Sequence, residues 1–317
     1  MTDPLFDAAI AGDRLSLSRA ISRIDNRSPG SLEAVAQLRP RRGKGPGAPL
    51  VLGITGPPGA GKSTFTNCVV TRAREGGKRV GVVAVDPSSP FSGGAILGDR
   101  LRMEAHAEDR NVFIRSLSSR GHLGGLSRAA GQVVDLMDAA GFDVIIVETV
   151  GVGQSELAVM EVVDTVLVVL TPESGDVVQT MKAGLLEVAD VFAVNKADRV
   201  GADTLARNLE MMVHLDASTG PNDWTIPVRT CAAVDNSGVD EVVDSVLDHA
   251  RWLQGFGRAA WDSRRATGRL RTFLDVVSED ARAAARAALN GEGAAMKRAL
   301  EQGLNPYVAA AQWLADS

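Results

Sequence analysis

The chain is 317 residues long, 45% hydrophobic and 23% charged, so it can form one large or two smaller domains around a sizeable core. A net charge of −5 argues against a general affinity for nucleic acid or anionic membranes. Two cysteines are too few for a disulfide framework or a cysteine-bound metal cluster, and we expect both to be buried free thiols in a reducing compartment. The N-terminus lacks a signal-peptide core and no apolar run approaches the roughly 20 residues that span a bilayer, which predicts a cytoplasmic protein.

Residues 1–38 are expected to form a helical N-terminal extension, because apolar residues from Leu5 to Ile24 recur at spacings of three and four. Helices this short cannot bury an apolar face alone, so we expect them to pack on the main domain. Residues 39–49 follow as a linker rich in proline, glycine and arginine. The arginines could contact phosphate, but a solvated, flexible connector is the favoured interpretation.

Residues 50–254 alternate apolar segments with amphipathic ones, which is typical of an α/β protein with a doubly wound, mostly parallel sheet between two layers of helices. The predicted strands are Leu50–Thr55, Arg79–Val85, Asn111–Leu117, Phe142–Thr149, Thr165–Thr171, Val191–Asn195 and Ile226–Cys231. The predicted helices are Lys62–Glu75, Asp99–Ala107, Leu126–Ala140, Asp176–Ala189, Asp203–Leu215 and Val239–Gln254. Ligands of such sheets bind beyond the carboxyl ends of the strands, and the polar motifs of this chain fall there.

The strand pattern stops near residue 255, and residues 255–317 are predicted to form a helical C-terminal arm. Four large aromatic residues lie in this arm or just before it: Trp252, Trp261, Tyr307 and Trp313. Aromatic residues concentrate both in domain cores and in dimer interfaces, so the residues alone leave both possibilities open.

The strongest motif is the segment G-P-P-G-A-G-K-S at residues 56–63, which follows a predicted strand and precedes a predicted helix. In the pattern G-x-x-x-x-G-K-[ST], glycines let backbone N–H groups converge on a phosphate chain, and the next helix presents its positive N-terminal end to the anion. Lys62 would reach the β- and γ-phosphates, and the hydroxyl of Ser63 would bind Mg²⁺. The predicted nucleotide-binding residues of this segment are Gly56, Pro57, Pro58, Gly59, Ala60, Gly61, Lys62, Ser63 and Thr64.

The second motif, N-K-A-D at residues 195–198, ends a predicted strand and predicts that the bound base is guanine. The carboxylate of Asp198 can accept hydrogen bonds from N1–H and the 2-amino group of guanine, a donor pair that adenine lacks. Asn195 can contact the purine edge and neighbouring loops, while the stem of Lys196 can lie over the base. The end of the next strand would offer backbone N–H groups to guanine O6, although an ordinary strand exit explains it equally well. Its residues are Cys231, Ala232 and Ala233.

The γ-phosphate and Mg²⁺ require carboxylates and a movable loop. Asp86 and Glu148 each end a predicted apolar strand, where a carboxylate would hold Mg²⁺, usually through a water molecule. Gly151 could donate its N–H to the γ-phosphate. Asp99 lies in a glycine-rich segment at the expected start of a helix, where it either joins the metal site or caps the helix.

In many GTPases a glutamine orients the attacking water, and the corresponding position in this chain is Val152. Gln154 lies two residues later and is not expected to reach the water. We therefore expect slow intrinsic hydrolysis of GTP, with a partner or a rearranged loop completing the site.

Together these motifs resemble the methylmalonyl-CoA-mutase-associated GTPases (the MeaB/ArgK family), chaperones of adenosylcobalamin-dependent mutases within the SIMIBI class of P-loop GTPases. The resemblance covers essentially the whole chain. The stretches that carry it are residues 56–64, 86–89, 96–103, 119–126, 148–156 and 195–198. One departure is His122, at a position where the family pattern suggests a small residue.

The resemblance implies a set of residues that bind phosphate and Mg²⁺, namely Lys62, Ser63, Asp86, Asp99 and Glu148. It also implies that residues 175–182 form an additional switch, in which Lys182 is important for stimulated hydrolysis. From spacing alone, this segment is a covering helix with Lys182 in solvent. With the resemblance, the expected catalytic residues are Lys62, Glu148 and Lys182.

The function that the resemblance implies is GTP-dependent gating of adenosylcobalamin loading, and protection, of methylmalonyl-CoA mutase or a related acyl-CoA mutase. The implied cofactors are GTP or GDP and Mg²⁺. The resemblance also implies a homodimer formed through the C-terminal arm, which favours an interface role for the aromatic residues. Contacts with the corrinoid belong to the partner enzymes.

Two other functions compete with this one. A metallocentre-insertion GTPase that delivers nickel would be expected to carry a histidine-rich tract or a Cys-x-x-Cys pair, and this chain has four scattered histidines and no such pair. A kinase or ATPase linked to transport of cationic amino acids would need adenine recognition, which Asp198 disfavours.

Overall fold

The computed structural model of the chain describes residues 3–42, 47–86, 106, 108–118, 123–149, 151, 162–174, 185–216, 223–290 and 294–316. The chain divides into two compact units, with the boundary between residues 266 and 267.

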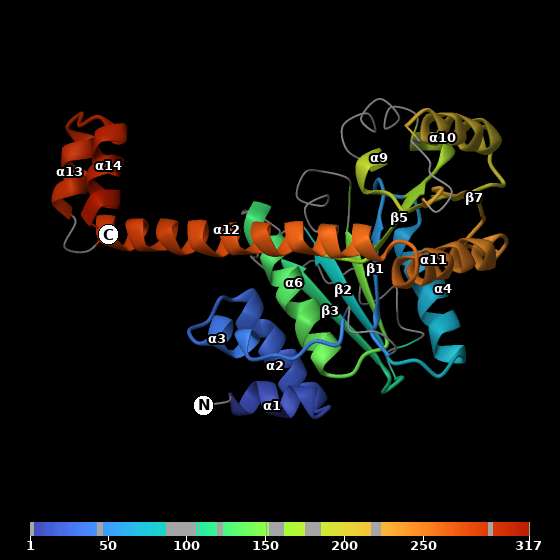
Figure 1. Cartoon of the computed structure of the whole chain (residues 1–317), viewed down its shortest axis with the longest axis horizontal. Helices are drawn as coiled ribbons and strands as arrows, with labels where there is room; N and C mark the ends of the chain where they lie inside the picture. The colour runs from blue at the N-terminus through green and yellow to red at the C-terminus, as the bar shows by residue number, and fades with distance from the viewer. Residues whose placement is uncertain are drawn as a thin grey trace. The chain divides into compact units, whose positions relative to one another are not determined.

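The first unit is built around a seven-stranded sheet in the order β3-β2-β4-β1-β5-β6-β7, in which all neighbouring strands are parallel (Figure 1). The strands are β1 Leu50–Thr55, β2 Val80–Asp86, β3 Val112–Ser118, β4 Val144–Thr149, β5 Thr165–Leu170, β6 Val191–Val194 and β7 Val228–Thr230. Every predicted strand is present, with ends shifted by at most one or two residues. The predicted doubly wound parallel sheet is confirmed.

Strands β1, β4, β5 and β6 are buried along nearly their whole length, because helices cover both faces of the sheet. Alternate side chains of a strand point to opposite faces, so Val51 joins one core cluster while Leu52 and Ile54 join the other. The helices on the first face are α6 Leu123–Ala139 and α10 Ala202–Asp216, and those on the second are α4 Lys62–Glu75 and α11 Val239–Gln254.

The helices of this unit match the prediction unevenly. Helices α4 and α11 have the predicted bounds, whereas α6 begins at Leu123, before the predicted start. Of the predicted helix at 99–107, only His106 lies among the described residues. Of the predicted helix at 176–189, the structure shows the short helix α9 Leu185–Val188, and the 3₁₀ helix η2 Pro172–Ser174 precedes this region.

Three N-terminal helices complete the first core, as expected for elements too short to be stable alone. They are α1 Pro4–Ile10, α2 Arg14–Asp25 and α3 Ser31–Ala36. Phe6, Leu17 and Ile21 are buried in the same cluster as the side chains of α6. The guanidinium of Arg14 donates to the carbonyl of Val112 at the start of β3, at 2.7 Å. The N-terminal helices therefore pack on the sheet domain.

The interpretation of the linker arginines as solvated is wrong for Arg41 and Arg42. Arg42 donates to both carboxylate oxygens of Asp164 at 2.8–3.1 Å, and its side chain is only 9% exposed. Arg41 pairs with Asp138 of α6, whose other oxygen accepts the backbone N–H of Arg42 at 2.7 Å. The physical reason is that a buried carboxylate needs hydrogen-bonding or cationic partners, and these two aspartates find them in the linker.

The connections between strands diverge next to β1. From β1 the chain moves across the strand order in one direction to reach β2, and from β4 it moves in the opposite direction to reach β5. In open α/β sheets, ligands bind beyond the carboxyl ends of the strands where connections diverge in this way. The topology therefore places the expected site at the ends of β1 and β4.

Helix α12 Arg258–Asn290 begins in the first unit and continues into the second, which also contains α13 Ala294–Glu301 and α14 Pro306–Asp316. Trp261, in the first unit, is 6% exposed and is a core residue there, whereas Tyr307, in the second unit, is 84% exposed. The aromatic residues of this region thus include both core and surface positions. Among the described residues, no helix is long and apolar enough to cross a membrane.

Candidate nucleotide site

The loop between β1 and α4 requires glycine at two positions. Gly56 has a φ of +150°, and a Cβ there would lie 2.0 Å from the carbonyl oxygen of Val169 on the neighbouring strand β5. Gly61 has a φ of +92°, and a Cβ there would lie 2.3 Å from Nδ2 of Asn195. Both distances are far below van der Waals contact, so glycine is needed for the loop to lie against β5 and Asn195.

Helix α4 begins at Lys62 with Gly61 at the N-cap position, and no side chain caps this end. Uncapped N–H groups at the start of a helix are suited to binding an anion. The ammonium of Lys62 donates to the carbonyls of Gly56 and Pro57 at 2.8 and 2.9 Å, and the residue is 6% exposed. The positive charge therefore lies inside the loop, at the position where a phosphate chain would be drawn.

Glu148 lies at the end of β4 and is held by two hydroxyl groups of α4. Ser63 Oγ donates to Glu148 Oε1 at 2.6 Å, and Thr66 Oγ1 donates to Glu148 Oε2 at 2.7 Å. Mg²⁺ is usually bound by one or two carboxylates together with phosphate and water oxygens. Ser63 and Glu148 fit this ion as a hydroxyl and a carboxylate that already touch, although the described residues contain no group of three His, Cys, Asp or Glu that could hold a metal.

Two buried threonines fix the backbone just beyond Glu148. Thr55, at the end of β1, donates to the carbonyl of Gly151 at 3.0 Å, and the hydroxyl of Thr149 lies 2.9 Å from that of Thr55. Both threonine side chains are completely buried. These bonds tie the chain after β4 to the end of β1, so Gly151 lies beside the start of the phosphate loop.

Asn195 joins the phosphate loop to the loop after β7. Its Nδ2 donates to the carbonyl of Ala60 at 2.8 Å, and its Oδ1 accepts the N–H of Ala233 at 3.0 Å. The residue is 3% exposed. The expected contact of Asn195 with neighbouring loops is therefore present, and it places the two motifs side by side.

The turn after Asn195 is held by a carboxylate that follows β5. Lys196 has a φ of +58°, and its Nζ lies 3.8 Å from one oxygen of Glu173. Arg199 pairs with the other oxygen of Glu173. A hydrogen bond from the residue's own backbone, followed by that from Arg199, lowers the pKa of Glu173 to about 2. Asp198 lies in the same turn and is exposed, so its carboxylate is accessible to a base edge.

The prediction that the N–H groups of Cys231, Ala232 and Ala233 serve guanine O6 needs correction in this conformation. These groups donate to the Val194 carbonyl, the Ser237 carbonyl and Asn195 Oδ1, at 2.8–3.0 Å. The first is a bond of the β6–β7 pair, and the others close the loop, so all three N–H groups are used within the protein. The segment is thus fixed to the end of β6 and to the side chain of Asn195.

Both cysteines lie near this loop. Burial raises the pKa of the Cys68 thiol, and it raises that of Cys231 to about 12. Cys231 is buried and Cys68 half-buried, and both are free thiols. A raised pKa keeps a thiol protonated and unreactive, in keeping with the expected structural role.

Several predicted site residues lie outside the described residues, among them Asp99, His122, Val152, Gln154 and Lys182. The backbone of Asp86 is described as the last residue of β2, paired with Ser118, but its side chain is not. Thr64 is exposed on the first turn of α4. The metal-side roles of Asp86 and Asp99 thus remain predictions.

Four polar residues that shape the site were not predicted from the sequence: Thr55, Thr66, Thr149 and Glu173. Thr66 follows Ser63 by three residues, a spacing that places both on one face of a helix and could have revealed it. Glu173 follows the carboxyl end of β5, the position that identified the other loops.

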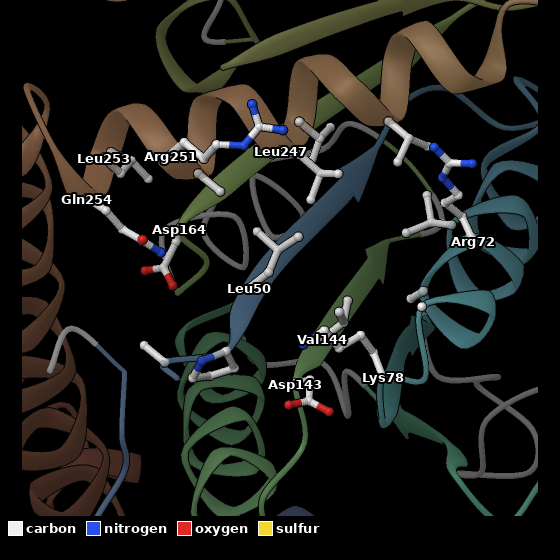
Figure 2. A pocket seen from close by; sticks show the side chains of 18 of the residues that line it. Leu50, Arg72, Lys78, Asp143, Val144, Asp164, Leu247, Arg251, Leu253 and Gln254 are labelled. Atoms are coloured by element: carbon white, nitrogen blue, oxygen red, sulfur yellow. The ribbon is translucent and has the colours of Figure 1, made fainter. Parts of the chain in front are cut away.

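A cavity of about 470 Å³ lies at the opposite edge of the sheet (Figure 2). Leu50 and Val144, which begin β1 and β4, line it together with Leu247 of α11. Figure 2 shows the guanidinium groups of Arg72 and Arg251 on the two helices that flank it. Because the phosphate loop follows the carboxyl end of β1, this cavity is separate from the candidate nucleotide site.

Comparisons with known proteins agree with the geometry. The family model described as "Methylmalonyl Co-A mutase-associated GTPase MeaB" matches residues 17–290. A Pyrococcus horikoshii protein named as a GTPase is 39% identical over 309 residues, which cover 97% of this chain and 96% of that protein. GTPase ArgK of Escherichia coli is 40% identical over 250 residues, 78% of this chain and 75% of that protein. A crystal structure titled "LAO/AO transport system kinase" has a TM-score of 0.69 and 28% identity, and covers 98% of this chain and 97% of its own.

Proposed function

The chain belongs to the family of methylmalonyl-CoA mutase-associated GTPases, and we propose that it is the GTP-hydrolysing chaperone of an acyl-CoA mutase. In this role it would gate the loading of adenosylcobalamin and protect the enzyme, which would be methylmalonyl-CoA mutase or a close relative. The GTPase activity itself follows from the family and from relatives named as GTPases.

The observation that carries the nucleotide part of the proposal is the position of Asn195. Its side chain contacts both the phosphate loop, at Ala60, and the loop after β7, at Ala233. A single buried amide therefore fixes the spacing between the expected phosphate and base contacts. Asp198 lies in the adjoining turn and is exposed to solvent. Its carboxylate can therefore accept the two donors of guanine, which supports guanine as the base.

We assign the phosphate chain to the segment 56–64, with Lys62 and Glu148 among the catalytic residues. Ser63 and Glu148 would hold Mg²⁺, with Asp86 and Asp99 as the other members of the acidic set. The ion would neutralise charge on the β- and γ-phosphates. The hydroxyl and carboxylate already lie 2.6 Å apart, which supports this assignment.

The partner-dependent part of the proposal rests on the family membership. Lys182, in the segment 175–182, would transmit the nucleotide state to the mutase and support stimulated hydrolysis. Intrinsic hydrolysis would be slow, because the position of the water-orienting glutamine is Val152. The nucleotide state would thus change slowly, and the mutase would respond to that state.

We also propose that the chain forms a homodimer through residues 255–317. Large apolar side chains on the part of α12 that lies in the second unit are exposed, with Leu270, Phe273 and Leu274 at 67%, 64% and 63%. Contiguous exposed apolar side chains on a helix are typical of a surface that another chain covers.

The test is GTP turnover by the purified protein with and without candidate mutases, repeated on Lys182→Ala. We expect slow turnover alone, a clear increase with the client mutase, and loss of that increase in the variant. Stimulation that survives the substitution unchanged would remove the role of Lys182. Failure of every acyl-CoA mutase to stimulate turnover or to bind would remove the chaperone function.

A kinase or ATPase linked to cationic amino-acid transport is the alternative, since the similar solved structure is of a protein named as a transport system kinase. The two functions differ in the base that they require. Competition between ATP and GTP for the site separates them, and a preference for ATP would favour the kinase. Preference for GTP would favour the mutase chaperone.

A further inference from the structure

Thr66 is completely buried on α4, and its hydroxyl donates to Oε2 of Glu148 at 2.7 Å. Ser63, one turn earlier, donates to the other carboxylate oxygen at 2.6 Å. Residues three apart on a helix lie on the same face, so α4 presents two hydroxyls to one carboxylate. Each oxygen of Glu148 therefore has its own donor from the same helix.

The chemistry of Thr66 is unusual for its position. Its neighbours on the buried side of α4, Phe65, Val69 and Val70, are apolar core residues, and burying a hydroxyl there is unfavourable unless it is hydrogen-bonded. Valine has nearly the same shape and would fill this space without a polar group. The hydroxyl that donates to Glu148 is thus what distinguishes threonine from valine at this position.

A threonine in a helix commonly donates to the carbonyl four residues earlier. Thr71 does this on the same helix, with its hydroxyl 3.0 Å from the carbonyl of Asn67. The hydroxyl of Thr66 instead donates across to β4, to a residue 82 positions away in the chain. The bond therefore acts on Glu148, whereas that of Thr71 acts within its own helix.

The two hydroxyls differ in what happens when a metal ion binds. In the proposed site, Ser63 is the residue whose oxygen binds Mg²⁺, so its bond to Glu148 has to adjust. Glutamate has more side-chain freedom than aspartate, and a single strand-end glutamate would lose orientation without a second anchor. Thr66 is not a proposed metal ligand and can keep its bond to Oε2 in both states.

We propose that Thr66 is a positioning residue that fixes the carboxylate of Glu148 for Mg²⁺, and thereby sets how tightly Mg²⁺ and nucleotide are bound together. The inference rests on the proposed metal site of Ser63 and Glu148. It predicts that the loss of one hydroxyl, without a change of shape, raises the Mg²⁺ concentration that is needed to retain the nucleotide.

The experiment compares Thr66→Val, which removes the hydroxyl, with Thr66→Ser, which keeps it. Dissociation of a fluorescent GDP analogue is followed at increasing Mg²⁺ and in excess EDTA. We expect Thr66→Val to need about tenfold more Mg²⁺ for half-maximal slowing of release, as is typical when the partner of a metal ligand is lost. Thr66→Ser should remain near wild type, and all three proteins should release the analogue alike in EDTA.

Three outcomes would overturn the inference. An unchanged Mg²⁺ midpoint in Thr66→Val would do so, and so would an equal acceleration in EDTA, which would mean a general loosening of the loop. If Thr66→Val does not fold, Thr66→Ala replaces it, and an unchanged Mg²⁺ midpoint in Thr66→Ala would overturn the inference in the same way. A wild-type protein whose release ignores Mg²⁺ would instead remove the proposed metal site itself.

Discussion

The two edges of the parallel sheet hold their buried carboxylates in different ways. At the carboxyl edge, Glu148 accepts hydrogen bonds from the hydroxyls of Ser63 and Thr66. At the amino edge, Asp164 and Asp190 lie one residue before β5 and β6 and are bound by guanidinium groups. All three carboxylates are at most 7% exposed, so the comparison is between equally buried groups.

The pairing at the amino edge is extensive. Asp164 accepts Nη2 of Arg42 at 2.8 Å and the indole N–H of Trp261 at 2.8 Å. Asp190 accepts both terminal nitrogens of Arg264 at 3.0 Å, as well as the backbone N–H of Val166 at 2.8 Å. The linker and the first turns of α12 are thereby fixed to the starts of two adjacent strands.

The donors that surround a buried carboxylate separate structural carboxylates from functional ones in this fold. A guanidinium stays charged and permanently neutralises its partner, which suits a joint between elements. A hydroxyl is a neutral donor, and the serine oxygen can also bind a metal ion. Burial alone does not distinguish the carboxylates of the two edges. The identity of their hydrogen-bond donors does.

The largest expected effect is at the amino edge, from Asp164→Ala. This change leaves the guanidinium of Arg42 and the indole N–H of Trp261 without their partner in a buried place. Breaking a buried ion pair from one side costs about 3–5 kcal/mol, so we expect a loss of this size in the free energy of unfolding. Urea denaturation measures it.

The control for Asp164→Ala is Asp262→Ala, which breaks the exposed pair of Asp262 with Arg258. Exposed pairs contribute about 0–1 kcal/mol. If the two variants lose the same stability, the amino edge is not the structural joint described above. The nucleotide affinity of folded Asp164→Ala should stay near wild type.

The second effect is at the phosphate loop, from Gly61→Ala. The new Cβ would meet Nδ2 of Asn195 at 2.3 Å, in a backbone conformation that alanine resists. We expect about 1–3 kcal/mol of strain and nucleotide binding weakened by roughly tenfold or more, measured by calorimetry. Gly59→Ala is the matched control, since Gly59 also has a positive φ but nothing lies within 4 Å of its Cβ position.

The third effect concerns the base and should leave stability untouched. Asp198→Asn replaces an exposed acceptor by a side chain that also donates. Loss of hydrogen bonds to a charged group costs about 1.5–3 kcal/mol, which corresponds to roughly 10- to 150-fold weaker GDP binding. Binding of xanthosine diphosphate, whose 2-oxo group needs a donor, should improve. Unchanged preference for guanine would show that Asp198 does not contact the base.

The smallest effect is a pH dependence at the amino edge. His249 is 1% exposed, its Nδ1 lies 3.0 Å from the hydroxyl of Thr165, and its Nε2 lies 3.5 Å from Asp190. Burial lowers the pKa of His249; Asp190 and Asp164 oppose this shift, and Arg264 adds to it.

Because the folded pKa is depressed, the unfolded chain binds a proton first as the pH falls below about 6.5. Stability should therefore decline with falling pH by at most about 1.4 kcal/mol per pH unit, until the folded pKa is reached. Urea titrations at several pH values measure this slope, and His249→Gln should reduce it. A slope that is equally reduced by substitution of the exposed His214 would exclude His249 as its source.

Secondary structure could be predicted from local sequence, whereas contacts between residues far apart in the chain could not. Strand β1 and helix α4 were predicted to the residue, because a glycine-rich turn separates an apolar run from an amphipathic one. The Pro/Gly-rich context of the linker predicts a solvated connector, yet the side chain of Arg42 is buried. The partner of Arg42 lies 122 residues away, and no local pattern points to it.

The fold class, the phosphate loop and the expected preference for guanine can be predicted from the amino-acid sequence alone. These depend on periodicity and on short motifs, which are contained in neighbouring residues. The folded structure is needed to show that Thr66 and Ser63 share Glu148, that Asn195 joins two loops, and that Arg42 is buried. Those pairings connect residues 38 to 135 positions apart, and they exist because the sheet brings together the ends of strands that are distant in the chain.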